Sequence, residues 1–158
     1  MQQVLSYNIH DIVKFRIVRN RNKSYGFRDL INLKFSCFEV EGVDKPDIIL
    51  NIGKFTPSNK DCYVIDHKYH AKENYFYCQD SEGKASWEVE IRGIENGDTV
   101  INFNVHNKFG LQPFINPDFL PQMLLLRMIE YKLSQKGYFL VHCAGVSKDG
   151  KAYLLCGR

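Results

Sequence analysis

The chain has 158 residues, of which 44% are apolar and 13% aromatic, so it is long enough for one domain with a substantial buried core. Its formal net charge of +3 is too small to indicate nucleic acid or an anionic membrane as a partner without a concentrated basic patch. No apolar run approaches the roughly 18 residues of a membrane span, and the segment MQQVLSYNIHD lacks the basic and apolar regions of a signal peptide. We therefore expect a cytoplasmic protein that binds neither nucleic acid nor membrane.

The first part of the chain has the alternating pattern of half-buried strands. Apolar side chains recur at every second position over residues 13–20 and again over residues 31–37, and a third apolar run over residues 47–52 follows Pro46. Polar segments between these runs predict turns. We expect the three strands to form an antiparallel meander.

The middle of the chain predicts more strands, first at residues 62–65 and 74–78. The clearest alternation follows over residues 86–92, where odd positions are apolar and even positions polar, so one face should pack and the other should meet water. The dipeptide Asn96-Gly97 then predicts a hairpin turn, beyond which residues 99–105 resume the alternation.

One helix is predicted between Asn116 and Gly137. Asn116 is a suitable N-cap, and Gly137 supplies the stop. Apolar residues cover most of the helix circumference, so we expect the sheet and other elements to enclose it.

Two apolar runs near the carboxyl end, residues 138–146 and 152–156, flank the dipeptide Asp149-Gly150. This dipeptide supplies the positive-φ residues of a tight turn, so the runs are predicted to pair as antiparallel strands. The second run is almost wholly apolar, as expected of a strand buried on both faces, and it leads directly into Gly157.

A buried strand that opens onto glycine is how a phosphate-binding loop of sequence G-x-x-x-x-G-K-[ST] begins. The segment FLVHCAGV (139–146), the Asp-Gly turn and the segment AYLLCG (152–157) resemble the residues that precede this loop in HPr kinase/phosphorylase-related proteins. The resemblance covers the predicted helix and hairpin and does not include Gly-Lys-Ser/Thr. It implies a phosphoenolpyruvate carboxykinase-like nucleotide-binding fold and ATP-dependent phosphoryl transfer to a serine or another small hydroxyl acceptor.

The resemblance also assigns roles to three residues. His142 would line the nucleotide and phosphoacceptor site, where it could donate to a phosphate oxygen or orient an acidic base. Gly157 would be the first glycine of the loop, and Arg158 a variable loop position. The loop lysine, the hydroxyl ligand of Mg²⁺ and the acidic residues would follow. The intact protein should therefore bind ATP and Mg²⁺, whereas this chain should bind no cofactor and should be inactive. From the residues alone, His142 also fits a structural histidine, and Gly157 an ordinary turn.

Three further groups have both a functional and a structural interpretation. His67 and His70 form an H-x-x-H pair that could share a metal, but no second pair has matching spacing, which favours a solvent-facing turn. Glu88 and Glu90 share a strand face and could work as an acid and base, although a solvated face is favoured. A basic concentration near the first strand could bind single-stranded nucleic acid, although a solvated sheet edge is favoured. Its members are Lys14, Arg16, Arg19, Arg21, Lys23 and Arg28.

The predicted fold class is therefore α+β. A strand-rich antiparallel part over residues 1–106 precedes a buried helix and a hairpin over residues 107–158, which lead to a truncated P-loop and complete one compact unit. The predicted function is that of the amino-terminal portion of an HPr kinase-like phosphotransferase, and the alternative is a non-catalytic binding or scaffold module derived from that fold. The expected partners are a protein or small-molecule phosphoacceptor and further copies of the chain, because apolar surface near Leu154 and Leu155 should be exposed.

Overall fold

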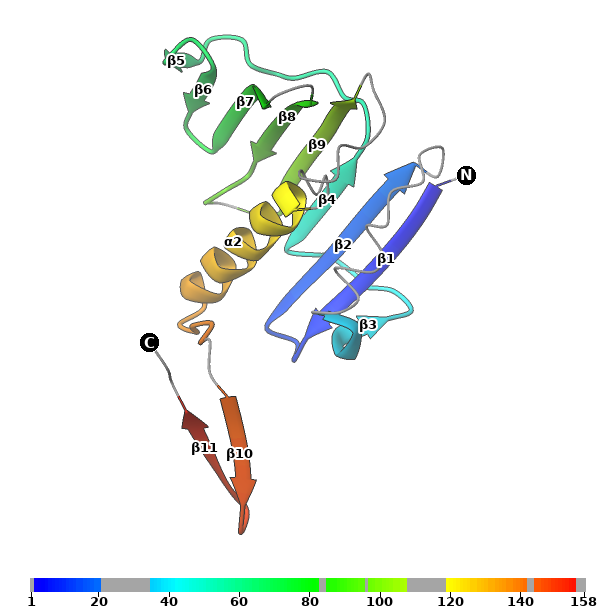
Figure 1. Cartoon of the computed structure of the whole chain (residues 1–158), viewed down its shortest axis with the longest axis vertical. Helices are drawn as coiled ribbons and strands as arrows, with labels where there is room; N and C mark the ends of the chain where they lie inside the picture. The colour runs from blue at the N-terminus through cyan, green and yellow to red at the C-terminus, as the bar shows by residue number, and fades with distance from the viewer. Residues whose placement is uncertain are drawn as a thin grey trace.

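The computed structural model describes residues 2–20, 35–82, 85–95, 97–107, 119–141 and 144–155. Within these ranges, nine strands form one sheet in the order β3-β1-β2-β4-β9-β8-β7-β6-β5, and two more form a separate hairpin (Figure 1). The strands of the sheet are β1 (Gln2–Ile9), β2 (Val13–Asn20), β3 (Glu39–Val40), β4 (Ile48–Ile52), β5 (Tyr63–Ile65), β6 (Tyr69–Lys72), β7 (Tyr75–Glu82), β8 (Ala85–Arg92) and β9 (Thr99–Asn107). The described part of the chain is thus a strand-rich α+β protein with a large mixed sheet.

β1 and β2 form the first hairpin, and β2 confirms the strand predicted over residues 13–20. The turn between them places His10 and Asp11 at φ values of 50° and 58°. Asn8 stabilises this turn, because its side-chain oxygen accepts a hydrogen bond of 2.9 Å from the backbone N–H of Asp11. On the buried side, the rings of Tyr7 and Phe15 stack with their centroids 4.6 Å apart.

The middle of the sheet is parallel, so the predicted antiparallel meander is wrong. β2 pairs with β4, and β4 with β9, in parallel register. After β2 the chain passes beyond β1, where β3 pairs with β1, and then returns as β4 on the other side of β2. The alternation of apolar residues predicts which side chains face the core, but it carries no information about strand direction.

The strand predicted over residues 31–37 is also wrong where the structure describes it. Ser36–Phe38 forms a 3-10 helix, η1, and the short strand β3 follows it. Residues 31–34 lie outside the described ranges.

From β9 to β5 the sheet is an antiparallel meander, as β9, β8, β7, β6 and β5 pair in succession. β8 and β9 confirm the alternation predicted over residues 86–92 and 99–105, and β5 and β7 confirm the strands predicted around residues 62–65 and 74–78. β6 was not predicted, because the alternation in its sequence YHAK spans only four residues and includes a single large apolar side chain.

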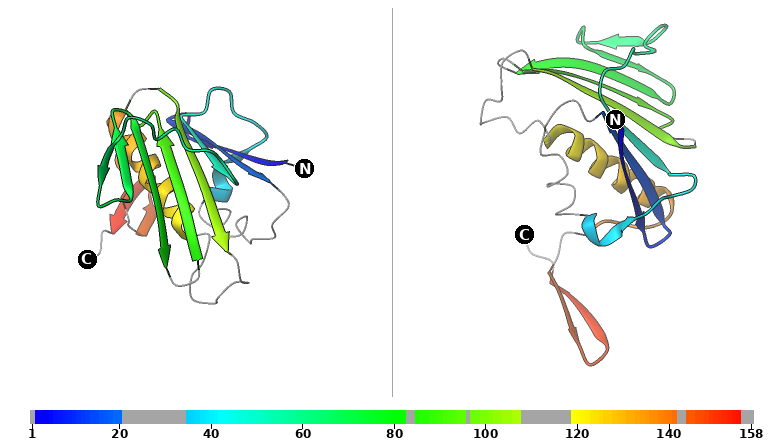
Figure 2. Two further views of the ribbon diagram at one scale, coloured as in Figure 1. Left: turned by 90° about the horizontal axis from the view of Figure 1, so that it is seen from above. Right: turned by 90° about the vertical axis from the view of Figure 1, so that its right-hand side faces the viewer.

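The helix α2 (Phe119–Gln135) lies against one face of the sheet, over β2 and β4 (Figures 1 and 2). Leu125, Ile129 and Leu133 recur at helical spacing and are buried in the same core cluster as Ile17 and Leu50 of the sheet. Full burial of one such side chain contributes about 2 kcal/mol to stability. This cluster is the core of the protein within the described ranges.

The carboxyl end of α2 confirms the predicted stop. Gly137 has φ of 80°, and the N–H of Tyr138 donates to the carbonyl of Leu133 at 2.9 Å, which is the closing bond of a Schellman motif. The predicted N-cap, Asn116, lies outside the described residues. The prediction that α2 is enclosed is wrong, since Met123 and Tyr131 are 40% and 37% exposed on the side away from the sheet.

The second sheet is the hairpin of β10 (Ala144–Lys148) and β11 (Lys151–Leu155). Its register leaves Asp149 and Gly150 as the turn, with φ values of 51° and 72°, which confirms the predicted tight turn. The hairpin projects away from the nine-stranded sheet (Figure 1 and the right-hand view of Figure 2), and Val146 and Leu154 are 52% and 63% exposed. The expectation that its second strand is buried on both faces is therefore wrong in this chain.

Candidate functional site

The three residues that the resemblance singles out, His142, Gly157 and Arg158, all lie outside the described residues. The hairpin β10–β11, which lies between them in sequence, is described. The residues that the structure does bring together lie elsewhere, on the face of the large sheet opposite α2, which we call the outer face.

Glu90 of β8 is the centre of a polar cluster on the outer face, where it is only 1% exposed. Its Oε1 accepts hydrogen bonds from the backbone N–H of Ser58 at 2.7 Å and from the hydroxyl of Tyr75 at 3.0 Å. Its Oε2 accepts one from Nδ2 of Asn102 at 2.8 Å and lies 3.4 Å from Nε of Arg92. The predicted solvated face is therefore wrong at this position, because the segment that contains Ser58 covers the carboxylate.

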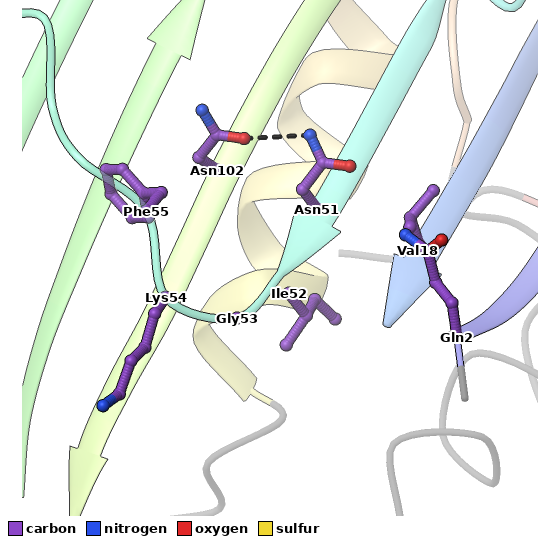
Figure 3. Close-up of a pocket in the computed structure, with 8 residues that line it drawn as sticks. All are labelled: Gln2, Val18, Asn51, Ile52, Gly53, Lys54, Phe55 and Asn102. Carbon is purple, nitrogen blue, oxygen red and sulfur yellow. Dashed lines mark hydrogen bonds between the residues drawn. The ribbon is translucent and has the colours of Figure 1, made fainter. Parts of the chain in front are cut away.

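The carboxylate of Glu90 also fixes the orientation of two asparagine amides. An ionised carboxylate can only accept, so Asn102 must turn its Nδ2 toward Glu90. Its Oδ1 then accepts from Nδ2 of Asn51 at 2.9 Å (Figure 3). Oδ1 of Asn51, the last group in this series of hydrogen bonds, accepts none from the described residues. We call Glu90, Asn102 and Asn51 the amide relay.

Glu88 lies two positions earlier on the same face and has its own partners. Its Oε1 accepts from Nδ2 of Asn104 at 2.8 Å, and the hydroxyl of Tyr77 lies 3.5 Å from its Oε2. Burial, together with the neighbouring carboxylates, raises the pKa of Tyr77, and burial with the hydrogen bond to Glu90 raises the pKa of Tyr75. Because donors of the sheet hold both glutamates, the arrangement does not favour the acid–base pair.

A pocket of about 280 Å³ opens at the carboxyl ends of β2 and β4, where the relay ends (Figure 3). We call it the strand-end pocket. It is lined by Gln2, Val18, Asn51, Ile52, Gly53, Lys54, Phe55 and Asn102. Oδ1 of Asn51 points toward the side formed by Val18 and Gln2, and Lys54 is the only charged residue among these eight (Figure 3). The pocket therefore combines amides, apolar side chains and one cation.

The other predicted groups do not form a site in the described ranges. His67 is exposed in a turn at φ of 57°, whereas His70 is half-buried on β6 with its ring 5.4 Å from that of Tyr77. No three His, Cys, Asp or Glu side chains among the described residues are placed to hold a metal ion.

Some of the basic residues near β2 make structural contacts within the fold. Nη2 of Arg16 donates to the carbonyl of Val43 at 2.7 Å, and Lys14 lies 3.5 Å from Asp11. β2 has β1 and β4 on its two sides, so the interpretation as a solvated sheet edge is wrong. Arg21, Lys23 and Arg28 lie outside the described residues.

A second charged cluster ties α2 to the amino ends of the parallel strands. Asp47 accepts from the backbone N–H of Lys14 at 2.7 Å and from Nζ of Lys136 at 2.7 Å. Lys132 is 4% exposed, and its Nζ donates to the carbonyls of Ile94 and Gly97. Burial lowers the pKa of Lys132. The donors and acceptors of this cluster satisfy one another, which indicates a structural role.

Sequence reasoning missed Ser58 and the two asparagines of the relay. A signal was present, because the strands on both sides of Asn96-Gly97 carry polar residues on one face, and Glu90 pairs with Asn102 in the register they form. Several polar side chains facing one another across two strands are typical of a covered network rather than a solvated face.

Comparison with protein-family models, curated proteins and solved structures finds no match for this chain. Among the described residues, no helix has the length and apolar character needed to cross a lipid bilayer.

Proposed function

We propose that this chain is the amino-terminal portion of an ATP-dependent phosphotransferase related to HPr kinase, with a serine or another small hydroxyl group as its acceptor. The observation that supports this most is the hairpin β10–β11. It turns tightly at Asp149-Gly150, and its apolar residues Val146 and Leu154 face solvent instead of the nine-stranded sheet. In the proposal the hairpin supplies the first two strands of a second, nucleotide-binding sheet, against which its exposed apolar residues would pack.

In this proposal the large sheet and α2 form a supporting domain, and the chemistry depends on residues that follow the hairpin. Gly157 would open the phosphate-binding loop, Arg158 would take a variable position in it, and His142 would lie beside the phosphates. Catalysis of phosphoryl transfer consists mainly of positioning and charge stabilisation by the loop lysine and metal-binding residues. The 158 residues contain no Gly-Lys-Ser/Thr sequence, so they are proposed to be inactive by themselves, while ATP and Mg²⁺ would be the cofactors of the intact protein.

Two observations test the proposal. The coding sequence past Arg158 should encode Gly-Lys-Ser/Thr in the same reading frame. Absence of this sequence from the frame would contradict the proposed kinase function. Calorimetric titration of ATP with Mg²⁺ into the 158-residue chain should give no binding heat. A micromolar dissociation constant for this chain would mean that the nucleotide site has been assigned to the wrong residues.

A non-catalytic binding module is the second candidate, and the edge strand β5 favours it. Tyr63, Val64 and Ile65 are 81%, 55% and 55% exposed at the end of the sheet, where an extended peptide could add a strand. This function predicts one saturable peptide or protein partner that is lost in Val64→Lys and retained in the matched variant Val146→Lys on the hairpin. Equal losses in the two variants would indicate nonspecific apolar retention.

A further inference from the structure

The strand-end pocket lies at the carboxyl ends of two neighbouring parallel strands whose next strands in sequence lie at opposite edges of the sheet. After β2 the chain continues to β3, beyond β1, whereas after β4 it continues to β5 at the opposite edge of the sheet. When the connections after adjacent parallel strands diverge, a crevice forms outside their carboxyl ends, and ligands commonly bind there. The pocket of about 280 Å³ occupies this position.

The polar groups at the floor of the pocket have fixed roles as hydrogen-bond donors and acceptors. Glu90 is held by three hydrogen-bond donors and an ion pair with Arg92, and it orients Asn102, which in turn orients Asn51. Oδ1 of Asn51 receives no hydrogen bond from the described part of the chain, and it is turned into the pocket (Figure 3). The pocket therefore presents an acceptor that cannot rotate to become a donor without breaking the relay.

The walls add a positive charge and apolar contacts. Lys54 is exposed at the rim, where its side chain is directed away from Asn51 (Figure 3), and its flexible four-carbon stem allows the ammonium to turn toward an anionic group in the pocket. Val18, Ile52 and Phe55 supply apolar surface. Gln2 contributes an amide from β1 that can both donate and accept (Figure 3).

From this arrangement we infer that the strand-end pocket binds a small carboxylate with a neighbouring amide N–H, which is the chemistry of an N-acylated amino acid. The N–H donates to Oδ1 of Asn51, the carboxylate lies near Nζ of Lys54, and the remaining atoms contact the apolar wall. A free acylated amino acid and the carboxyl-terminal residue of a peptide share this chemistry. The inference concerns the large sheet and does not depend on the proposed phosphotransferase function.

The test uses the 158-residue chain and N-acetylglycine as the probe. Calorimetry, with the side-chain amide signals of the ¹⁵N-labelled protein as a second readout, should show saturable binding in the millimolar range expected of so small a ligand. N-acetylsarcosine, in which a methyl group replaces the amide hydrogen, should bind at least about fivefold more weakly because the acceptor of Asn51 is left unpaired. N-acetylglycinamide, which lacks the carboxylate, should bind about two- to fivefold more weakly.

Variants connect these preferences to the residues. Lys54→Met should remove the preference for N-acetylglycine over N-acetylglycinamide, and the matched control Lys60→Met should keep it. Glu90→Gln should reduce the preference for N-acetylglycine over N-acetylsarcosine, because an amide can donate as well as accept and so no longer fixes the direction of the hydrogen bonds through Asn102 and Asn51. If Glu90→Gln does not fold, the variants Lys54→Met and Lys60→Met, together with the two ligand comparisons, still test whether the strand-end pocket binds this ligand.

A hexapeptide with a free glycine carboxylate distinguishes the two sources of the ligand. Tighter binding of the peptide than of N-acetylglycine supports the inference with a peptide terminus as the occupant, and binding of N-acetylglycine alone supports it with a free acylated amino acid. The inference is overturned if neither probe binds saturably, or if N-acetylsarcosine binds as well as N-acetylglycine.

Discussion

At position 90 a carboxylate that is 1% exposed accepts hydrogen bonds from a backbone N–H, a tyrosine hydroxyl and an asparagine amide, with an arginine close to it. Each donor comes from a different strand or segment, so Glu90 joins β7, β9 and the segment around Ser58 on the outer face. Loss of any of these partners would leave the buried carboxylate partly unpaired and would lower the stability of the fold.

Glu90→Gln should therefore destabilise the protein although it changes the side-chain shape very little. The neutral glutamine loses the ion pair with Arg92 and the charge-assisted hydrogen bonds from Ser58 and Tyr75, even when Asn102 turns to accept its N–H, at a cost of about 2 kcal/mol. Urea unfolding measures this loss. The matched change Glu95→Gln, on an exposed side chain, should stay within about 0.5 kcal/mol of the unmodified protein. Equal stability of the two variants would show that the cluster does not hold the outer face together.

Tyr75 makes the free energy of unfolding depend on pH in the alkaline range. Burial and the hydrogen bond to Glu90 raise the pKa of Tyr75 in the folded protein, so the unfolded chain releases its phenol proton first, above about pH 10. The contribution of Tyr75 to the free energy of unfolding is present below that pH and should be lost as the pH rises further. The alkaline loss, measured by urea unfolding, should be smaller in Tyr75→Phe than in Tyr63→Phe, whose side chain is exposed. Comparing the two variants cancels the contribution of Lys132, where burial lowers the pKa and stability rises with pH.

At the scale of single elements, local chemistry predicted structure well. Asp149-Gly150 predicted a tight turn and Gly137 predicted a helix end, because both depend on backbone conformations that few residues adopt. Strand direction and burial could not be predicted in the same way. They depend on segments distant in sequence, such as the excursion through β3 that makes β4 parallel to β2 and the segment around Ser58 that covers Glu90.

The hairpin β10–β11 predicts how the chain behaves at high concentration. Val146 and Leu154 expose apolar side chains on an element that does not pack on the large sheet, so copies of the chain should associate through it. Sedimentation velocity should show concentration-dependent association that decreases in Leu154→Lys. The unfolding free energy of this variant should change by less than about 0.5 kcal/mol, since the side chain is exposed. A monomer at every concentration would contradict the prediction.

Considered as a whole, the molecule has a mixed sheet with α2 on one face and a hydrogen-bonded polar network on the other, and a hairpin that stands apart (Figure 2). The α+β class, the strand-rich character and the single predicted helix followed from periodicity in the sequence. The strand-end pocket could not be predicted, because it requires the parallel arrangement of β2 and β4 that periodicity leaves open. The two proposals assign separate tasks to these parts, ligand binding to the sheet and nucleotide binding to the protein's continuation beyond the hairpin.

The proposed phosphotransferase function is tested most directly by calorimetric titration of ATP with Mg²⁺ into the protein encoded by the reading frame continued past Arg158. We predict saturable binding with a micromolar dissociation constant, which is lost when the lysine of the expected Gly-Lys-Ser/Thr sequence is replaced by alanine. Absence of binding by the continued protein, or binding that survives this replacement, would contradict the proposal.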